Sequence, residues 1–168
     1  EIVIRDRYCA VHTDANQRAG YFPGATPSHI LVQVGTDGRI LGAQAVGADG
    51  VDRRIDVIAT AMRAGLSATD LIDLDLAYAP PYGQAKDPVN QTGMVAHNVL
   101  TGELVLTGPE ALTEDTPVLD VRTVGEYAAG HMPNSLNIPH TQLRDRLDEV
   151  QAWVDETVGD QPFVVMCA

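Results

Sequence analysis

The sequence predicts two modules in one chain: an α+β module with an antiparallel sheet over residues 1–101, and part of an α/β module with a parallel sheet over residues 102–168. Two patterns support this. In the first stretch strand-like runs come first and helix-like runs follow, which favours an α+β fold. In the second, strand-like and helix-like runs alternate, which favours parallel strands with helices on the sheet faces. With 45% hydrophobic and 20% charged residues, the chain has an ordinary globular composition.

The charge and the cysteine content of the chain limit the classes of partner that it can bind. The chain has 11 Lys and Arg against 23 Asp and Glu, a net charge of −12, and no basic run, so it is a poor match for nucleic acid or an anionic membrane. Its apolar runs are too short to span a bilayer. The two cysteines, Cys9 and Cys167, stand in no metal-ligand spacing. We expect a cytoplasmic protein without a metal site, a nucleic-acid partner or a membrane partner.

The first module is expected to open on strands. The run Ile2–Ile4 has strand composition, and Ile30–Val34 and Ile40–Val46 are rich in β-branched and alternating residues. The turn Thr36–Arg39, with Gly38 where a positive φ is needed, joins the last two into a hairpin.

A helix is expected from about Val51 to Ala64, because apolar residues recur at helical spacing and Gly65 follows as a C-terminal cap. The residues assigned to its inner face are Val51, Ile55, Ile58, Ala59 and Met62. The residues assigned to its outer face are Arg53, Arg54 and Asp56.

Capping signals predict two further helices. Ser67 and Asp70 resemble a capping box, which opens a short helix ending near Asp73. Asp87 followed by Pro88 predicts a helix that runs to Leu100.

In the second module, strands are expected at Pro117–Val121, Leu136–Ile138 and Phe163–Met166. Thr123 and Glu126 form a capping box that opens a helix ending at Gly130. A second helix is expected from about Thr141. The residues assigned to its inner face are Leu143, Leu147, Val150, Val154 and Val158.

Asp120, Arg122 and Cys167 all follow the carboxyl ends of predicted strands. Ligands of open α/β sheets bind at that edge. A thiol there becomes a reactive thiolate when the following loop turns its N–H groups inward, and the same cradle suits an anionic persulfide. Alternatively, Cys167 is a small buried core residue after an apolar strand.

Short motifs run through the second module: Leu119-Asp120-Val121-Arg122, Glu126-Tyr127, Gly130-His131-Met132-Pro133-Asn134-Ser135, Asn137-Ile138-Pro139 and Val164-Val165-Met166-Cys167. In order and spacing they resemble a rhodanese domain over about residues 103–168. The resemblance implies that Cys167 is the nucleophile and carries sulfur as a persulfide, with Asp120 and Arg122 in support. We expect Arg122 to pair with Glu126, and His131 to be a structural loop residue.

The first module has its own motifs: Tyr21-Phe22-Pro23-Gly24, Ile40-Leu41-Gly42-Ala43-Gln44, Arg54-Ile55-Asp56-Val57, Leu76-Ala77-Tyr78-Ala79-Pro80-Pro81-Tyr82 and Ala85-Lys86-Asp87-Pro88. Residues 1–101 resemble the dimerisation domain of pyridine-nucleotide-disulfide oxidoreductases, in the coenzyme A disulfide reductase branch. The resemblance implies a homodimer in which Tyr78, with Tyr21, reaches the flavin and the coenzyme A thiol, while Lys86 binds a coenzyme A phosphate. A plain core tyrosine is the alternative for Tyr21. Cys9 is expected to be a buried or inert thiol, and Met62 to be core or dimer interface.

Together the resemblances imply the C-terminal part of an enzyme that uses FAD and NAD(P)H to reduce coenzyme A disulfide or persulfide. The chain has no Gly-x-Gly-x-x-Gly fingerprint. It is therefore expected to bind neither FAD nor the nicotinamide alone. Since both ends fall in or beside strand-like runs, we expect the chain to be a piece of a longer polypeptide. We also expect little sulfurtransferase activity from the piece alone, because it lacks the loop whose amides would surround the Cys167 thiolate.

Two other functions stay open: a persulfide carrier without turnover, and a dimerisation or interaction module with an inactive rhodanese-like half. The substrate also stays open among coenzyme A disulfide, coenzyme A persulfide, polysulfide and oxygen, as does the choice between NADH and NADPH.

Overall fold

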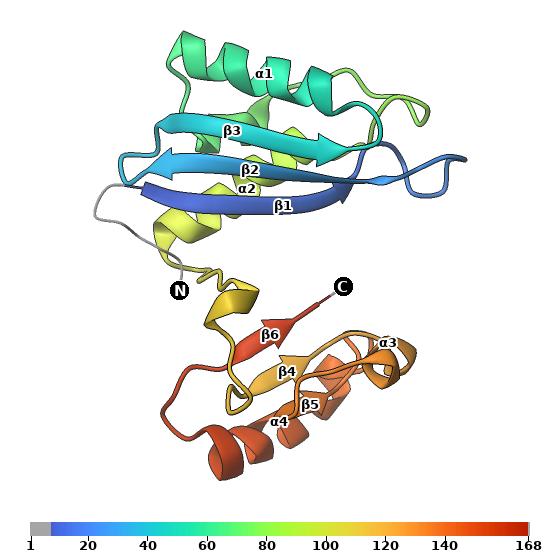
Figure 1. Cartoon of the computed structure of the whole chain (residues 1–168), viewed down its shortest axis with the longest axis vertical. Coiled ribbons are helices and arrows are strands. Elements are labelled where there is room, and N and C mark those ends of the chain that lie inside the picture. Colours follow the sequence, from blue (N-terminus) through green and yellow to red (C-terminus); the bar gives the residue numbers. More distant parts are fainter. Residues whose placement is uncertain (1–7, 168) are drawn as a thin grey trace. The chain divides into compact units, whose positions relative to one another are not determined.

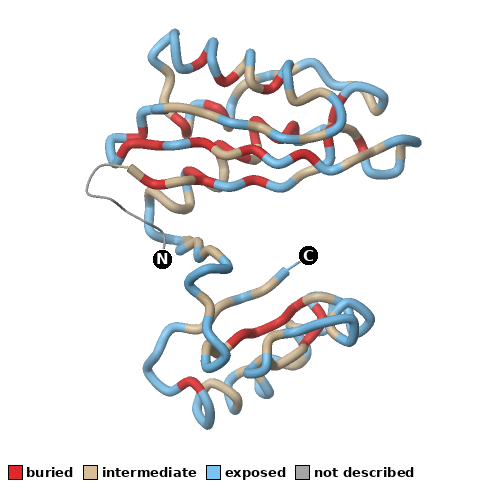
Figure 2. Tube along the Cα trace, viewed as in Figure 1, coloured by how far each residue is buried: buried red, intermediate tan, exposed pale blue. Residues whose placement is uncertain are grey.

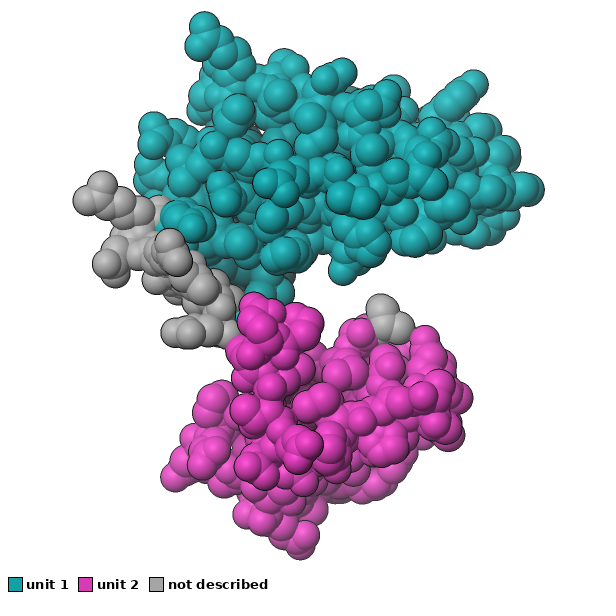
Figure 3. All heavy atoms as spheres, viewed as in Figure 1, with its two compact units in different colours: residues 1–106 teal, residues 107–168 magenta. Residues whose placement is uncertain are grey.

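The computed structural model describes residues 8–167, so the expected strand Ile2–Ile4 lies outside the described residues. The chain divides into two compact units, Glu1–Leu106 and Thr107–Ala168 (Figures 1 and 3). Within the described part, no helix combines the length and the apolar character that crossing a membrane requires.

The first unit is built on an antiparallel sheet in the order β1-β2-β3, made of β1 (Tyr8–Asn16), β2 (Pro27–Gly35) and β3 (Ile40–Gly47). The predicted hairpin is confirmed as β2 and β3, whose register slips once at Gln33/Val34. Strand β1 was not predicted, because Thr13 interrupts the run of apolar inward positions and Ala10 the run of polar outward ones, which weakens the alternation. Its inward residues are Cys9, Val11 and Thr13.

Three helical segments follow the sheet: α1 (Val51–Ala64), the 3-10 helix η1 (Thr69–Asp73) and α2 (Pro88–Thr101). Both long helices begin and end close to the predicted residues, so the predicted α+β architecture is confirmed. Helix α1 packs on β3 and α2 packs on β1. The core lies between the sheet and these helices (Figure 2), and its largest apolar members are Val11, Ile30, Val32, Val34, Ile40, Ile58, Leu71 and Val89.

The predicted faces of α1 are partly wrong. Ile58 is buried as expected, but Met62 is 42% exposed, and Arg54, assigned to the outside, is only 1% exposed. Arg54 precedes Ile58 by four residues and therefore shares its face. It can be buried there because Asp87, at the start of α2, pairs with its guanidinium.

The second unit has the predicted parallel sheet, and its strands lie in the order β5-β4-β6. Its strands are β4 (Val118–Asp120), β5 (Ser135–Asn137) and β6 (Val164–Met166), and α3 (Val124–Ala129) follows β4. The short 3-10 helix η2 (Pro109–Ala111) precedes them. The small core consists of Leu119, Val121 and Ile138, with Leu136, Leu143, Val150, Trp153 and Phe163 packed against it.

The helix expected from Thr141 is three segments in succession: the 3-10 helix η3 (Leu143–Arg146), α4 (Leu147–Trp153) and the π-helical η4 (Val154–Val158). The number of residues per turn differs between these helix types, so one helical spacing does not predict a single inner face. Leu147, assigned to that face, is 56% exposed. Trp153 packs edge-on against Phe163, with ring centroids 5.5 Å apart.

Candidate functional site

The carboxyl edge of the parallel sheet brings the predicted residues of the second unit together. Asp120, the last residue of β4, is paired in register with Met166 of β6. The Val121 N–H donates to the Met166 carbonyl at 2.9 Å. Cys167 follows directly and is exposed. The alternative of a buried core cysteine is therefore wrong for this structure, and the thiol lies at the edge where α/β sheets bind ligands.

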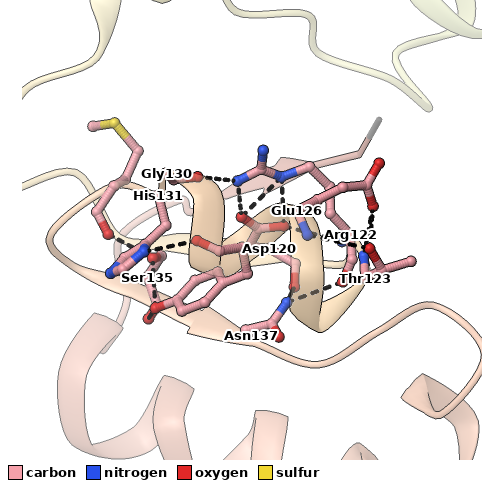
Figure 4. Close-up of polar contacts among 10 residues, drawn as sticks. Asp120, Arg122, Thr123, Glu126, Gly130, His131, Ser135 and Asn137 are labelled. Atoms are coloured by element: carbon pink, nitrogen blue, oxygen red, sulfur yellow. Dashed lines mark hydrogen bonds and ion pairs between the residues drawn. The ribbon is translucent and has the colours of Figure 1, made fainter.

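Asp120 and Arg122 form an ion pair at this edge (Figure 4). The Arg122 Nε donates to Asp120 Oδ1 at 3.0 Å and its Nη2 donates to Oδ2 at 2.6 Å. This two-point hydrogen bond holds the pKa of the buried Asp120 carboxyl below its usual range and raises the pKa of Arg122. The Arg122 Nη2 also donates to the Gly130 carbonyl at 2.8 Å, which ties the far end of α3 to the sheet edge.

The expected pairing of Arg122 with Glu126 is wrong, because Glu126 closes the predicted capping box of α3. Its Oε2 accepts from the Thr123 N–H at 2.9 Å and from the Thr123 hydroxyl at 2.6 Å. These bonds, the hydroxyl first, lower the pKa of Glu126. Arg122 takes the buried carboxylate two residues before it instead, where both oxygens face the guanidinium (Figure 4).

His131 is held by its own loop, in agreement with a structural role. Its Nδ1 lies 3.0 Å from the Tyr127 carbonyl oxygen, and its ring stacks on Tyr127 with centroids 3.9 Å apart. The Tyr127 hydroxyl donates to the Ser135 carbonyl, and the Asn137 amide donates to the carbonyls of Asp120 and Arg122. The segment between β4 and β5 is thus fixed by side chains from β4, α3 and β5.

The first unit brings Tyr21 and Tyr78 together, although they lie 57 residues apart in the chain. Their hydroxyl oxygens are 3.4 Å apart. Tyr21 is 79% exposed and Tyr78 is 47% exposed, so the core alternative for Tyr21 is wrong. The hydrogen bond with Tyr21 raises the pKa of Tyr78. The unit therefore presents two phenols side by side on its surface.

The remaining candidates differ in exposure. Lys86 is exposed and directly precedes Asp87, whose side chain caps α2 by accepting from the Val89 N–H. Cys9 is buried in β1, and burial raises the pKa of its thiol. Of these two thiols, only Cys167 is accessible to a small sulfur compound.

Arg54 was not predicted from the sequence as a residue that contacts the loops of Tyr21 and Tyr78. Its guanidinium contacts both Gln17, at the start of the loop that carries Tyr21, and Asp87, at the end of the loop that carries Tyr78. The available signal was its four-residue spacing from Ile58, which places it on the inner face of α1.

Comparison with known proteins identifies both units. The sequence profile of the pyridine nucleotide-disulphide oxidoreductase dimerisation domain matches residues 5–88. The profile of the rhodanese-like domain matches residues 109–168.

Individual relatives agree with the profiles. A coenzyme A disulfide reductase of Staphylococcus haemolyticus is 43% identical over 93 residues, which are 55% of this chain and 21% of that protein. The crystal structure of reduced Bacillus anthracis CoADR-RHD superposes with a TM-score of 0.83 at 43% identity, covering 95% of this chain and 28% of that one. A NAD-dependent persulfide reductase from A. fulgidus gives 0.83 at 38% identity, covering 96% and 28%.

This chain thus spans about a fifth of the curated reductase and little more than a quarter of each of these solved chains. The dimerisation-domain profile matches half of the chain, and the rhodanese-like profile begins at residue 109, after residues 89–108. The chain belongs to the pyridine nucleotide-disulphide oxidoreductase family, with its dimerisation domain followed by a rhodanese-like domain.

Proposed function

We propose that this chain is the dimerisation and sulfur-transfer part of an FAD- and NAD(P)H-dependent reductase of coenzyme A disulfide or coenzyme A persulfide. The observation that carries the proposal is the position of Cys167, an exposed thiol directly after β6 at the carboxyl edge of the parallel sheet. The similarity to coenzyme A disulfide reductases and to a persulfide reductase supports the reductase half.

In the rhodanese-like unit, Cys167 is the proposed nucleophile. Its thiolate attacks the sulfane sulfur of a donor persulfide R–S–S⁻, the donor S–S bond breaks, and R–S⁻ leaves. Cys167 then holds the sulfane sulfur as a persulfide and passes it to the next thiol by the same exchange. Asp120 and Arg122 support the step by holding the loop after β4, and neither is assigned a proton transfer.

In the dimerisation unit, Tyr78 and Tyr21 are the proposed hydrogen-bond donors to the sulfur that leaves when a disulfide or persulfide of coenzyme A is reduced. A phenol placed there stabilises the developing thiolate. FAD, when bound, supplies two-electron transfer from NAD(P)H. The exposed phenol pair can contact a flavin and a thiol. The sequence lacks the Gly-x-Gly-x-x-Gly loop that binds the phosphates of a dinucleotide.

Two features complete the proposal. Lys86, a cation just before the N-terminus of α2, is assigned to a coenzyme A phosphate. The dimerisation domain implies a homodimer, in which we propose that the phenol pair of one subunit serves the flavin of the other.

The persulfide role predicts a specific loss. In the full-length protein treated with a sulfane-sulfur donor, Cys167→Ser abolishes the thiocyanate released by cyanide, because the attacking sulfur is gone. Cys9→Ala removes the buried thiol and keeps thiocyanate release at the wild-type level. Equal release from Cys167→Ser and wild type would place the sulfur elsewhere and contradict the role.

The phenol role is tested by removing one hydroxyl. Tyr78→Phe in the full-length protein is expected to lower kcat for NAD(P)H-dependent coenzyme A disulfide reduction by about 10²-fold, the usual cost of a lost proton donor. Tyr82→Phe is the control, since that side chain is 69% exposed and outside the pair. Steady-state NAD(P)H oxidation measures both. An unchanged kcat in Tyr78→Phe refutes the assignment, and a wild type without turnover favours the carrier function.

The Asp120–Arg122 pair predicts a pH dependence. Because the folded state holds the Asp120 pKa below its unfolded value of about 3.9, the pair stabilises the unit fully above that value and loses this contribution as the pH falls through the folded value. Asp120→Asn should therefore flatten the fall of the unfolding midpoint in acid. Trp153, the single tryptophan, reports unfolding of this unit by fluorescence. Asp148→Asn, at an exposed position, should keep the wild-type slope; the same slope in Asp120→Asn would count against the pair.

A further inference from the structure

The Tyr21–Tyr78 pair is not held together by packing of its rings. Tyr21 is 79% exposed and Tyr78 is 47% exposed, and they lie on separate loops, one joining β1 to β2 and the other joining η1 to α2. The 3.4 Å between their hydroxyl oxygens therefore depends on how the bases of the two loops are fixed.

One buried side chain contacts the bases of both loops. The Arg54 Nη2 donates to the Gln17 carbonyl at 2.6 Å and to Asp87 Oδ2 at 2.8 Å, while its Nε donates to Asp87 Oδ1 at 3.2 Å. Its Nη1 donates to the Gly50 carbonyl at 2.8 Å. Gln17 begins the loop that carries Tyr21, and Asp87 ends the loop that carries Tyr78.

Further hydrogen bonds fix the two loops close to the residues that Arg54 contacts. Gln17 closes the first loop, since its side chain accepts from the Thr26 N–H at 2.7 Å and donates to the Gly24 carbonyl at 3.1 Å. The two loops are also joined to each other, because the Ala19 N–H donates to the Gly83 carbonyl at 2.9 Å. Together these bonds leave the two loop bases little freedom to move apart.

Arg53, next to Arg54 on helix α1, contacts the loop that carries Tyr78. The Arg53 Nη2 donates to the Tyr82 carbonyl at 2.6 Å and lies 3.7 Å from Asp87 Oδ2. Helix α1 therefore holds the Tyr78 loop at two points through consecutive arginines.

We infer that Arg54 is a positioning residue that sets the separation of the Tyr21 and Tyr78 hydroxyls by fixing both loops to one guanidinium. The inference rests on the proposed function for its catalytic meaning, since it assigns to Arg54 the geometry of the phenol pair that meets the substrate sulfur.

A lysine cannot replace Arg54 in this role. The ammonium is a single donor centre, whereas the planar guanidinium contacts both oxygens of Asp87, the Gln17 carbonyl and the Gly50 carbonyl from three nitrogens. Arg54→Lys therefore keeps the buried positive charge and loses the attachment of both loops to one guanidinium, so that, within the described part of the chain, the Ala19–Gly83 and Gln84–Asn16 hydrogen bonds alone join the loop bases.

Tyrosine titration of this chain tests the inference without any substrate. In the wild type, the hydrogen bond with the Tyr21 hydroxyl raises the pKa of Tyr78. Tyr21→Phe removes this upward shift and identifies its signal. Arg54→Lys is expected to remove the shift as well, while the chain still unfolds cooperatively. Arg63→Lys, an exposed arginine on the same helix, keeps it.

A folded Arg54→Lys chain that keeps the high Tyr78 pKa overturns the inference. Asp87→Asn, which keeps a side-chain oxygen to cap α2, is a second test, and it should also remove the upward shift of the Tyr78 pKa. If neither variant folds, Arg54 acts on stability alone and the inference is also overturned.

In the full-length protein, Arg54→Lys should lower kcat with coenzyme A disulfide by up to about 10²-fold with little change in KM, as expected when reacting groups are misplaced by about 1 Å. If the wild-type protein does not reduce coenzyme A disulfide, the proposed function fails, and the titration still decides the role of Arg54.

Discussion

The dimerisation unit depends on one buried cation. Removing a guanidinium from water costs several kcal/mol, and only good geometry with further hydrogen bonds offsets that cost. Arg54 meets this condition by taking oxygen partners from the loop after β1, from the residue before α1 and from the cap of α2. Because those partners belong to three separate segments, the segments must converge wherever Arg54 is satisfied. The surface that carries the two tyrosines is built on that point of convergence.

The rhodanese-like unit uses the same pair of residue types over a shorter distance. Asp120 is the last residue of a buried strand, and the Arg122 guanidinium, two residues later, donates to its carboxylate. The pair therefore forms within three consecutive residues. Its further bond to Gly130 spans α3 and ties the end of that helix to the carboxyl edge of the sheet. In both units an arginine–aspartate pair fixes loop segments: the bases of the two tyrosine loops in the first unit and the segment after β4 in the second.

Much of this structure could be predicted from local patterns. Caps at Asp87 and Thr123 located two helices, and alternating elements predicted the parallel sheet. Motif resemblance identified both families, and it named Tyr21, Tyr78 and Cys167. The failures have different causes: a distant partner, two acceptors that compete for one arginine, and a change of helix type. Arg54 was placed outside because its partner Asp87 lies 33 residues away, and Arg122 was paired with Glu126 because two acceptors competed for it. Leu147 was misplaced because the helix type changes along the segment.

A double-mutant cycle between Arg54 and Asp87 tests most directly whether this pair serves position rather than stability. Arg54→Met and Asp87→Ser, which keeps a capping hydroxyl, are made singly and together, and the free energy of unfolding and the Tyr78 titration are measured on each. We predict a coupling of about 1–3 kcal/mol, with the double variant more stable than the sum of the single losses implies. We also predict that the double variant lacks the raised Tyr78 pKa despite its regained stability. Additive losses, or a double variant that keeps the raised pKa, would contradict the account.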